Sequence, residues 1–324
     1  MTRRDRNPYA TPIKCVPSSA GLEHWFTKPG VGSSNLSGRA NQTKYGMDLV
    51  TVTCTRDKEE MILQAHSLDV FAINKIKHWV IVEDDSTTIE EWRGLLSKFY
   101  TRHELILLKG HDTFIENGWV KQQLYKLTIA NHIKTDSYLI LDSLLCLIKP
   151  VNFLDWPIEH GNGDPVDSTP NKIHFDRCWT DFIQSYTSKY QLSIPTKLYY
   201  PLVPFRMNTE LSKKIIHDNL EEKIKNFSII SEFLIYQFYA NHFDVPLHEV
   251  RNNQAIIIWE NANYPVNLTC LIEADYKFFG INRYKLKADR NKISLIGITN
   301  FLSSLGLNKT LVKNYIQNLK YINY

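Results

Sequence analysis

Common metal-binding and nucleotide-binding signatures are missing from this sequence. Its five cysteines form no CxxC pair and lie at no structural-zinc spacing from a histidine. No GxGxxG, GxSxG or Walker A pattern occurs either. These absences remove support for hydride transfer on a dinucleotide, for serine hydrolysis and for P-loop chemistry. An odd number of scattered cysteines favours a reduced, cytoplasmic setting.

Long hydrophobic runs are also missing. The longest candidates, such as residues 138–147, have the length of a strand and contain Asp142. A membrane-spanning helix needs about 20 apolar residues, so the sequence predicts no membrane span. The 324 residues are 43% hydrophobic and 22% charged, which is a globular composition. This length suits one large α/β domain with appendages or two smaller domains.

Charge is unevenly distributed along the chain. Residues 1–46 carry seven basic and two acidic residues, and residues 285–324 carry seven basic and one acidic residue. Because the whole chain is only +4, the part between them is net acidic. A net acidic body argues against a broad nucleic-acid-binding face. The basic C-terminal segment either contacts an anionic membrane surface on the cytoplasmic side or packs on the domain with its lysines in water.

The first 46 residues differ from the rest. They hold five of the 13 glycines, and they show neither helical nor strand periodicity. We expect this leader, residues 1–46, to be disordered and Met47 to be the true start of the protein. An organelle transit peptide is the alternative, because the leader contains Arg and Ser and few acids, although it has no convincing amphipathic helix.

From Met47 onward the hydrophobic pattern alternates between strand and helix periods. It predicts strands at residues 49–54, 78–82, 104–108 and 138–141, with helices between them at 57–71, 89–100 and 119–132. This order predicts an α/β fold with a mainly parallel sheet flanked by helices. Further along, the pattern predicts helices at 179–190, 209–217 and 227–242, a strand at 255–259, an extended segment at 195–207 and two C-terminal helices.

Polar residues follow the predicted strands at their carboxyl ends, where ligands bind in such sheets. Arg56 follows the first strand, Asp84 and Asp85 follow the second, and Asp142 ends the last. Asp142 is suited to a divalent cation or a ribose hydroxyl, Arg56 to a diphosphate, and the two neighbouring aspartates to a nucleoside. The structural alternatives are a turn cap for Asp142, a surface helix start for Arg56 and N-caps for the aspartates.

Two predicted helices carry further candidates. Lys121, Gln122 and Lys126 follow Gly118, where amides and cationic side chains can receive phosphate oxygens, although such runs usually face solvent. Glu232 lies in an otherwise apolar helix. Burial there would raise its pKa and suit it to act as a base or to orient an acceptor hydroxyl. A structural ion pair is the alternative for Glu232.

Four segments together resemble GT-A-fold glycosyltransferases: Thr53-Cys-Thr-Arg56, Glu83-Asp-Asp85, Gly118-Trp-Val-Lys121-Gln-Gln-Leu-Tyr-Lys126 and Tyr138-Leu-Ile-Leu-Asp142-Ser143. More narrowly, they resemble a bacterial glycosyltransferase-like family catalogued as a domain of unknown function. The resemblance continues through residues 231–236 and 279–283 and covers most of residues 47–305.

This resemblance implies a GT-A-like (Rossmann-like) catalytic domain over residues 47–284, followed by a basic helical segment over 285–324. It implies a cytoplasmic enzyme of hexosyltransferase type that moves a sugar from a nucleotide-sugar donor to a glycan or a lipid-linked acceptor. Asp142 and Glu232 are the implied catalytic residues. The implied donor-binding residues are Thr55, Arg56, Asp84, Asp85, Lys121, Gln122, Lys126 and Arg283.

The implied metal site departs from the family pattern. Asp142 is the expected ligand of a divalent Mn or Mg ion, but the second carboxylate of the Asp-x-Asp pair is replaced by Leu144. One carboxylate alone does not hold such an ion tightly, so Lys121, Lys126 and Arg283 are the expected carriers of the leaving-group charge. Two rivals remain. One is a non-catalytic relative that binds a nucleotide-sugar or glycan. The other is a nucleotidyltransferase, which normally has a Gly-rich loop after its first strand.

Overall fold

The computed structural model of this chain describes residues 47–84, 86–155, 166–167, 177–198, 203–247, 255–258, 276–281 and 295–321. The leader predicted over residues 1–46 lies outside these ranges. The strands are β1 (Asp48–Thr53), β2 (Lys77–Val82), β3 (Glu104–Lys109), β4 (Ser137–Asp142), β5 (Cys146–Leu147), β6 (Val166–Asp167), β7 (Lys197–Leu198), β8 (Phe205–Asn208), β9 (Ala255–Ile258) and β10 (Phe278–Ile281). The helices are α1 (Lys58–Phe71), α2 (Ile89–Leu96), α3 (Gly118–Thr128), α4 (Arg177–Tyr190), α5 (Thr209–His217), α6 (Leu220–Ile224), α7 (Glu232–His242), α9 (Leu295–Ser304) and α10 (Lys309–Tyr321). Short 3-10 turns are η1 (Thr55–Asp57), η2 (Ser97–Phe99), η3 (Ile129–Asn131) and η4 (Phe153–Asp155).

A five-stranded sheet in the order β3-β2-β1-β4-β8 forms the centre of the fold. The first four strands in the chain run parallel, and Asp48 at the start of β1 lies opposite Lys77 of β2 and Tyr138 of β4. β8 pairs with β4 in the antiparallel direction. The predicted α/β fold with a mainly parallel sheet is therefore confirmed. The sequence predicted only an extended segment over residues 195–207, and its pairing as an edge strand is a tertiary feature.

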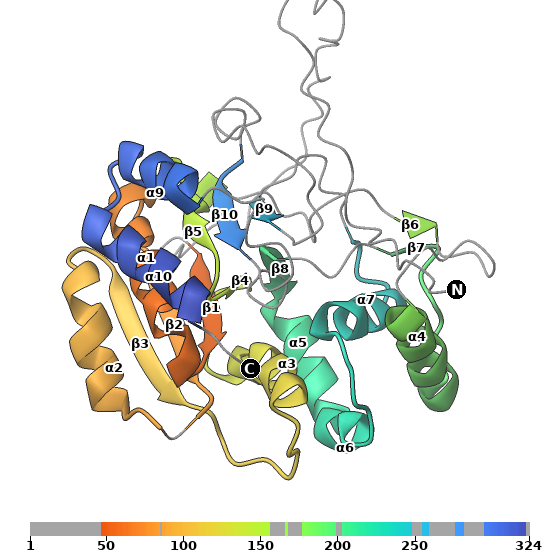
Figure 1. The fold of residues 1–324 in the computed structure, drawn as a ribbon. Coiled ribbons are helices and arrows are strands. Elements are labelled where there is room, and N and C mark those ends of the chain that lie inside the picture. Colours follow the sequence, from red (N-terminus) through yellow and green to blue (C-terminus); the bar gives the residue numbers. More distant parts are fainter. Residues whose placement is uncertain are drawn as a thin grey trace, which may run out of the picture.

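Helices cover both faces of this sheet (Figure 1). Val80 and Val82 of β2 belong to the cluster that α1 and α2 bury on one face. Trp79 and Ile81 of the same strand belong to the cluster that contains α3, α5 and α7 on the other face. Successive strand side chains point to opposite faces, and both faces here are covered, which explains why the strands read as nearly continuous hydrophobic runs.

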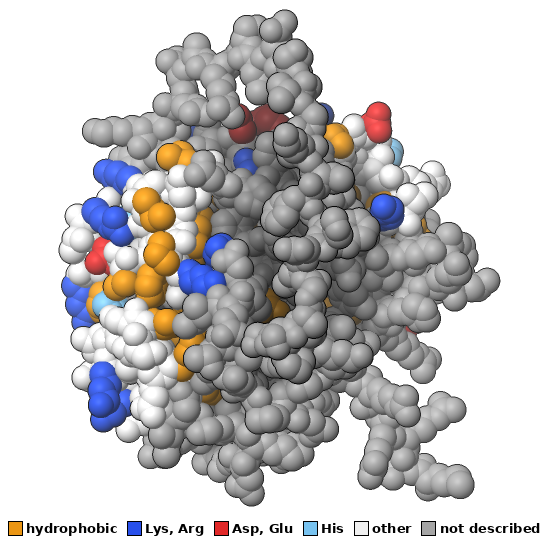
Figure 2. Space-filling model, turned by 90° about the horizontal axis from the view of Figure 1, so that it is seen from above, with side chains coloured by type: hydrophobic (Ala, Val, Ile, Leu, Met, Phe, Trp, Pro, Cys, Tyr) orange, Lys and Arg blue, Asp and Glu red, His pale blue; other side chains and the backbone are white. Residues whose placement is uncertain are grey.

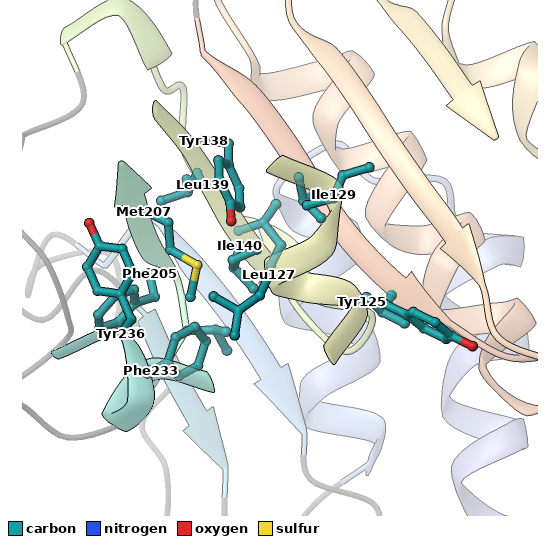
Figure 3. Close-up of a cluster of buried hydrophobic side chains, with 14 of the residues drawn as sticks. Tyr125, Leu127, Ile129, Tyr138, Leu139, Ile140, Phe205, Met207, Phe233 and Tyr236 are labelled. Atoms are coloured by element: carbon teal, nitrogen blue, oxygen red, sulfur yellow. The ribbon is translucent and has the colours of Figure 1, made fainter. Parts of the chain in front are cut away.

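The core between the sheet and the α3–α7 layer is rich in aromatic side chains (Figure 3). Phe205 of β8 stacks on Phe233 of α7 with ring centroids 4.4 Å apart. The buried Tyr138 hydroxyl donates to the backbone oxygen of Lys126 at 3.1 Å and lies 3.0 Å from the Ser212 hydroxyl. These contacts fix α3, α5 and α7 relative to β4, and so they fix the side chains that α3 and α7 present to the end of β4.

The start of α7 differs from the prediction. A helix over 227–242 was expected, with Glu232 in its interior, but α7 begins at Glu232. Ser231 is the N-cap, and its hydroxyl accepts a hydrogen bond from the Leu234 amide at 3.3 Å. A serine is a favoured N-cap because its oxygen satisfies an amide that has no partner within the helix. Glu232 is therefore a first-turn residue.

A second, three-stranded sheet in the order β5-β10-β9 follows the end of β4. β10 pairs antiparallel with β5 and parallel with β9. A Cβ atom on Gly280 of β10 would lie only 2.3 Å from Leu144 Cδ1, so a glycine is required for this strand to pass beside Leu144. The strand β10 was not predicted from the sequence.

The C-terminal helix α10 packs against α1, and α9 packs against α10 (Figure 1). Val312, Tyr315 and Ile316 of α10 are buried, and the Asn308 amide before α10 donates to His66 Nε2 of α1 at 3.0 Å. Lys309 and Lys313 are exposed. Viewed from above, the described surface on this side shows basic side chains beside hydrophobic ones (Figure 2). This packing favours the alternative in which the helices lie on the domain with their lysines in water.

Within the described part of the chain, none of the helices is both long enough and apolar enough to cross a bilayer. The expectation of no membrane span therefore holds for these residues. The predicted peripheral contact with a membrane stays a prediction.

Candidate functional site

The sheet order brings the carboxyl ends of β1 and β4 side by side. The chain passes from β1 to β2 and β3 on one side and then returns to β4 on the other side of β1. In open α/β sheets, ligands bind where the strand order reverses in this way. Ser143 after β4 donates a hydrogen bond to Asp57 Oδ2 after β1, at 2.8 Å, so the two loops are joined there.

The loops after β1 and β2 are held together by Asp84. Its carboxylate accepts hydrogen bonds from the Thr55 amide at 2.9 Å and from the Thr55 hydroxyl at 2.7 Å. Asp84 therefore caps η1, whereas the N-cap of α2 is Thr88, which forms a capping box with Glu91. The structure thus brings the predicted residues Thr55 and Asp84 into direct contact. The predicted residue Asp85 lies outside the described residues.

Glu83 is a site residue that the sequence reasoning did not single out. Its carboxylate is partly buried and lies against Gly118, where a Cβ atom would be 2.9 Å from Glu83 Oε1. Burial raises the pKa of this carboxyl to about 7, and the Lys121 ammonium opposes that rise. Gly118 therefore makes room for a titratable group at the amino end of α3, beside the predicted phosphate ligand Lys121.

Lys126 joins the two predicted catalytic carboxylates. Its ammonium Nζ lies 2.8 Å from Asp142 Oδ1 at the end of β4 and 2.9 Å from Glu232 Oε1 at the start of α7. The contact with Asp142 is a hydrogen bond, whereas the contact with Glu232 is an ion pair without hydrogen-bond geometry. The lysine side chain is 4% exposed, Glu232 is 2% exposed, and Asp142 is 34% exposed. Asp142 is the member of this triad that reaches solvent.

Burial and the neighbouring charges shift the pKa values of Lys126 and Glu232 in opposite directions. Burial alone would lower the pKa of Lys126, but the two carboxylates outweigh it and hold that pKa above its usual value. Burial raises the pKa of Glu232, and Lys126 partly offsets the rise. Lys126 is therefore a permanent cation. Glu232 contacts Lys126 and barely reaches solvent, so its predicted role as an acceptor base stays a prediction, and the ion pair expected as the alternative is present.

The remaining predicted residues differ in accessibility. Arg56 is exposed, with a side chain 48% accessible, and its Nε lies 3.7 Å from Asp57 Oδ1. Lys121 and Gln122 are partly buried on the first turns of α3. Arg283 lies outside the described residues. Arg56 and Lys121 thus remain accessible to an anion at this end of the sheet, whereas Lys126 is committed to carboxylates.

Gln64 of α1 also supports the site and was missed. Its side-chain amide donates to the backbone oxygens of Asp142 at 2.8 Å and Leu145 at 2.9 Å, and its oxygen accepts from the Thr51 hydroxyl at 3.0 Å. These bonds fix the turn that follows β4. The sequence signal was a glutamine at helical spacing from the inward apolar residues Met61 and Leu68.

The described residues do not fit the divalent cation that the resemblance implies. Asp142 Oδ1 is bonded to an ammonium, and the second ligand position is the hydrocarbon side chain of Leu144, which packs against the core. Across the described ranges, no group of three His, Cys, Asp or Glu side chains could hold a metal ion. The prediction that Asp142 is a metal ligand is therefore not supported by its surroundings.

A cavity of about 500 Å³ lies away from this site. It is formed by the ends of β2 and β3, the second half of α3 and the junction of α5 and α6, and its polar lining includes Lys109, His111, His132 and Glu221. None of the predicted site residues lines it. The carboxyl ends of β1 and β4 are the better candidate site because they combine the reversal of strand order with the polar side chains.

Comparison with known proteins gives a family and a set of structures. Residues 50–245, more than half of the chain, match the family described as "Family of unknown function (DUF6492)". No curated protein sequence matches the chain.

The solved structures to which the chain is similar include three glycosyltransferase chains, all at low identity. The apo structure of the bifunctional glycosyltransferase WbbM is 11% identical with a TM-score of 0.46, and the match covers 74% of this chain and 46% of that one. Apo GlyE from Streptococcus pneumoniae TIGR4 is 11% identical with a TM-score of 0.43, covering 85% and 64%. The galactosyltransferase LgtC, in complex with donor and acceptor sugar analogs, is 12% identical with a TM-score of 0.46, covering 80% and 96%. The match thus spans less than two thirds of the WbbM and GlyE chains.

Proposed function

The chain belongs to the family of unknown function DUF6492, and we propose that it is a glycosyltransferase that uses a nucleotide-sugar donor. The observation that carries this proposal is the gathering of polar side chains where the strand order reverses. Thr55 and Asp84 bond across the ends of β1 and β2, while Ser143 and Asp57 bond across the ends of β4 and β1. The point where the strand order reverses is where open α/β sheets bind nucleotides.

We assign the donor diphosphate to the cationic side chains at this end of the sheet. Lys121 lies on the first turn of α3, whose amino end adds the positive end of a helix dipole, and Arg56 is exposed after β1. Both cations are within the segments that resemble GT-A enzymes. The solvent-accessible carboxylate of Asp142 is suited to accept hydrogen bonds from donor hydroxyls. Asp85 and Arg283 remain proposed donor ligands from the sequence.

The proposed reaction moves a glycosyl group between two oxygens. The bond from the anomeric carbon to the diphosphate oxygen breaks, a bond from that carbon to the acceptor oxygen forms, and the proton of the acceptor hydroxyl passes to the departing diphosphate or to solvent. The protein contributes by stabilising the departing diphosphate and by orienting the acceptor. We assign Lys121 and Arg56 to the first task. Glu232 contributes by fixing Lys126, and through it Asp142, in position.

The proposed acceptor is a glycan or a lipid-linked saccharide. A lipid-linked acceptor would draw on contact between the exposed lysines of α10, Lys309 and Lys313, and an anionic membrane surface. A non-catalytic relative that binds the same donor is the alternative function. The observation that favours it is the replacement of the second carboxylate by Leu144.

The test is a binding and turnover experiment on the full chain. Thermal stability is measured against UDP, GDP, ADP, CDP and dTDP and the matching nucleotide-sugars, since a ligand that binds the native state raises its melting temperature. Kd for the best ligand is then measured for Lys121→Gln and for Lys134→Gln. Lys134 is the matched control because it is exposed and precedes β4, at the opposite end of the sheet.

We expect one nucleotide family to bind, and Lys121→Gln to weaken its Kd about 10-fold or more, the effect of one charge-assisted hydrogen bond. Lys134→Gln should leave Kd unchanged. If no nucleotide stabilises the folded chain, the proposal is wrong. Binding without sugar transfer or donor hydrolysis would select the non-catalytic relative.

A further inference from the structure

We propose that the ammonium of Lys126 takes the place of a divalent cation beside Asp142, so that this chain binds its nucleotide-sugar without a metal ion. The inference rests on the proposed function, because it concerns how the same site holds its donor. It goes further because it names the buried side chain whose charge offsets that of Asp142, where a bound ion would otherwise do so, and it leaves the diphosphate to other cations.

The contacts of Lys126 leave little room for a competing ion. Its Nζ is 2.8 Å from Asp142 Oδ1 and 2.9 Å from Glu232 Oε1, and it lies 5.5 Å from the centroid of the Phe233 ring. With only 4% of the side chain exposed, the ammonium has exchanged water for two carboxylates and an aromatic face. A divalent ion would have to expel this cation to reach the inner oxygen of Asp142.

The second ligand position is closed by packing. Leu144 lies against the hydrophobic core and beside Gly280 of β10, so closely that a Cβ atom on residue 280 would be 2.3 Å from Leu144 Cδ1. A divalent ion such as Mg or Mn needs several oxygen ligands. At this position it would meet methyl groups instead.

The charge of the triad points the same way. Lys126 Nζ donates a hydrogen bond to Asp142 Oδ1 at 2.8 Å, so Asp142 is already paired with a cation. Asp142 therefore needs no metal ion to offset its charge at the donor site. The diphosphate charge is left to cations outside the triad, such as the partly buried Lys121.

Removing the ammonium should create the metal site that the wild type lacks. Two carboxylate oxygens lie within 2.9 Å of the position of Nζ. Without the lysine they would face one another across a small space, which is an arrangement that attracts a divalent cation. Lys126→Ala opens that space, and Leu144→Asp restores the second carboxylate while leaving Lys126 in place.

The first experiment measures the Kd of the best-bound nucleotide by calorimetry, in EDTA and in Mn²⁺, for the full wild-type chain. We expect the two values to agree within twofold. A Kd more than tenfold tighter in Mn²⁺ would overturn the inference and leave the proposed function intact. If no nucleotide binds in either condition, the proposed function fails.

The second experiment needs no nucleotide, so it separates the two failures. Binding of Mn²⁺ alone is followed by electron paramagnetic resonance for the wild type, Leu144→Asp and Lys126→Ala. We expect the wild type and Leu144→Asp to bind no stoichiometric Mn²⁺ and Lys126→Ala to bind one ion. The double variant Lys126→Ala with Asp142→Asn should lose this ion. The inference is wrong if the wild type or Leu144→Asp binds one Mn²⁺ ion and the further change Asp142→Asn removes it. Lys126 would then not exclude the ion from Asp142. Because Leu144→Asp changes a partly exposed side chain, it keeps the test informative if Lys126→Ala fails to fold.

Discussion

Replacing Lys126 by methionine tests whether the triad is as tightly coupled as its geometry indicates. Methionine is similar in length and leaves no large cavity, so the change removes mainly the charge. Glu232, 2% exposed, would lose its cation, while Asp142, 34% exposed, would still be solvated. Removing one partner of a buried ion pair costs about 3–5 kcal/mol, because the other charge is left buried. We expect a loss of that size in the free energy of unfolding at pH 8.

The loss should depend on pH with a definite sign. Burial already raises the pKa of Glu232 in the folded chain, and without Lys126 it would rise further. When the pKa of a carboxyl is higher in the folded chain than in the unfolded chain, its ionised form lowers the free energy of unfolding at pH values above the folded pKa. This destabilisation decreases as pH falls towards the unfolded pKa. The destabilisation of Lys126→Met should therefore shrink on acidification, by up to about 1.4 kcal/mol per pH unit.

Urea unfolding followed by tryptophan fluorescence at pH 6 and pH 8 measures both effects. Lys134→Met is the matched control, because this exposed lysine should change stability by less than about 0.5 kcal/mol. Lys126→Met with Glu232→Leu should recover most of the loss, since a buried pair replaced by apolar groups is often neutral. A loss below about 1 kcal/mol for the single variant, or no recovery in the double variant, would refute the coupling.

Three further outcomes are expected. Because burial raises the pKa of Glu83 to about 7, above the unfolded value of 4.5, the wild type should lose stability as pH rises through that range, and Glu83→Gln should flatten the melting temperature between pH 5 and pH 8. If the melting temperature of Glu83→Gln depends on pH as that of the wild type does, other groups cause the loss of stability. Gly280→Ala should destabilise the chain by about 1–3 kcal/mol in urea unfolding, and adding Leu144→Ala should recover part of this loss. If the losses of the two single variants simply add in the double variant, contact between residues 280 and 144 is not the cause. Asp84→Ala removes the acceptor of two hydrogen bonds from Thr55. It should lower the free energy of unfolding by about 1–3 kcal/mol and weaken nucleotide binding. Stability equal to that of the wild type would show that this contact does not hold the β1 and β2 loops together.

The sequence by itself determined the alternation of strands and helices. Strand and helix periods are local signals, and they placed β1 to β4 and the helices between them to within a few residues. The exceptions are α2 and α3, which end earlier, at Leu96 and Thr128, and continue as η2 and η3. Polar residues at strand ends also predicted which side chains would gather at one edge of the sheet. Thr55, Asp84 and Asp142 lie there because parallel strands bring their carboxyl ends together.

Only the tertiary structure decided which of these residues bond to each other. Lys126 reads as a solvent-facing residue of a Lys/Gln-rich helix, because helical periodicity does not reveal that α7 and the end of β4 supply carboxylates to it. Likewise, no local pattern shows that Glu83 lies against Gly118 or that Leu144 needs Gly280 beside it. These pairings join segments far apart in the chain, and they depend on how the sheet and helices pack. That packing is why a lysine, rather than a second aspartate, stands beside Asp142.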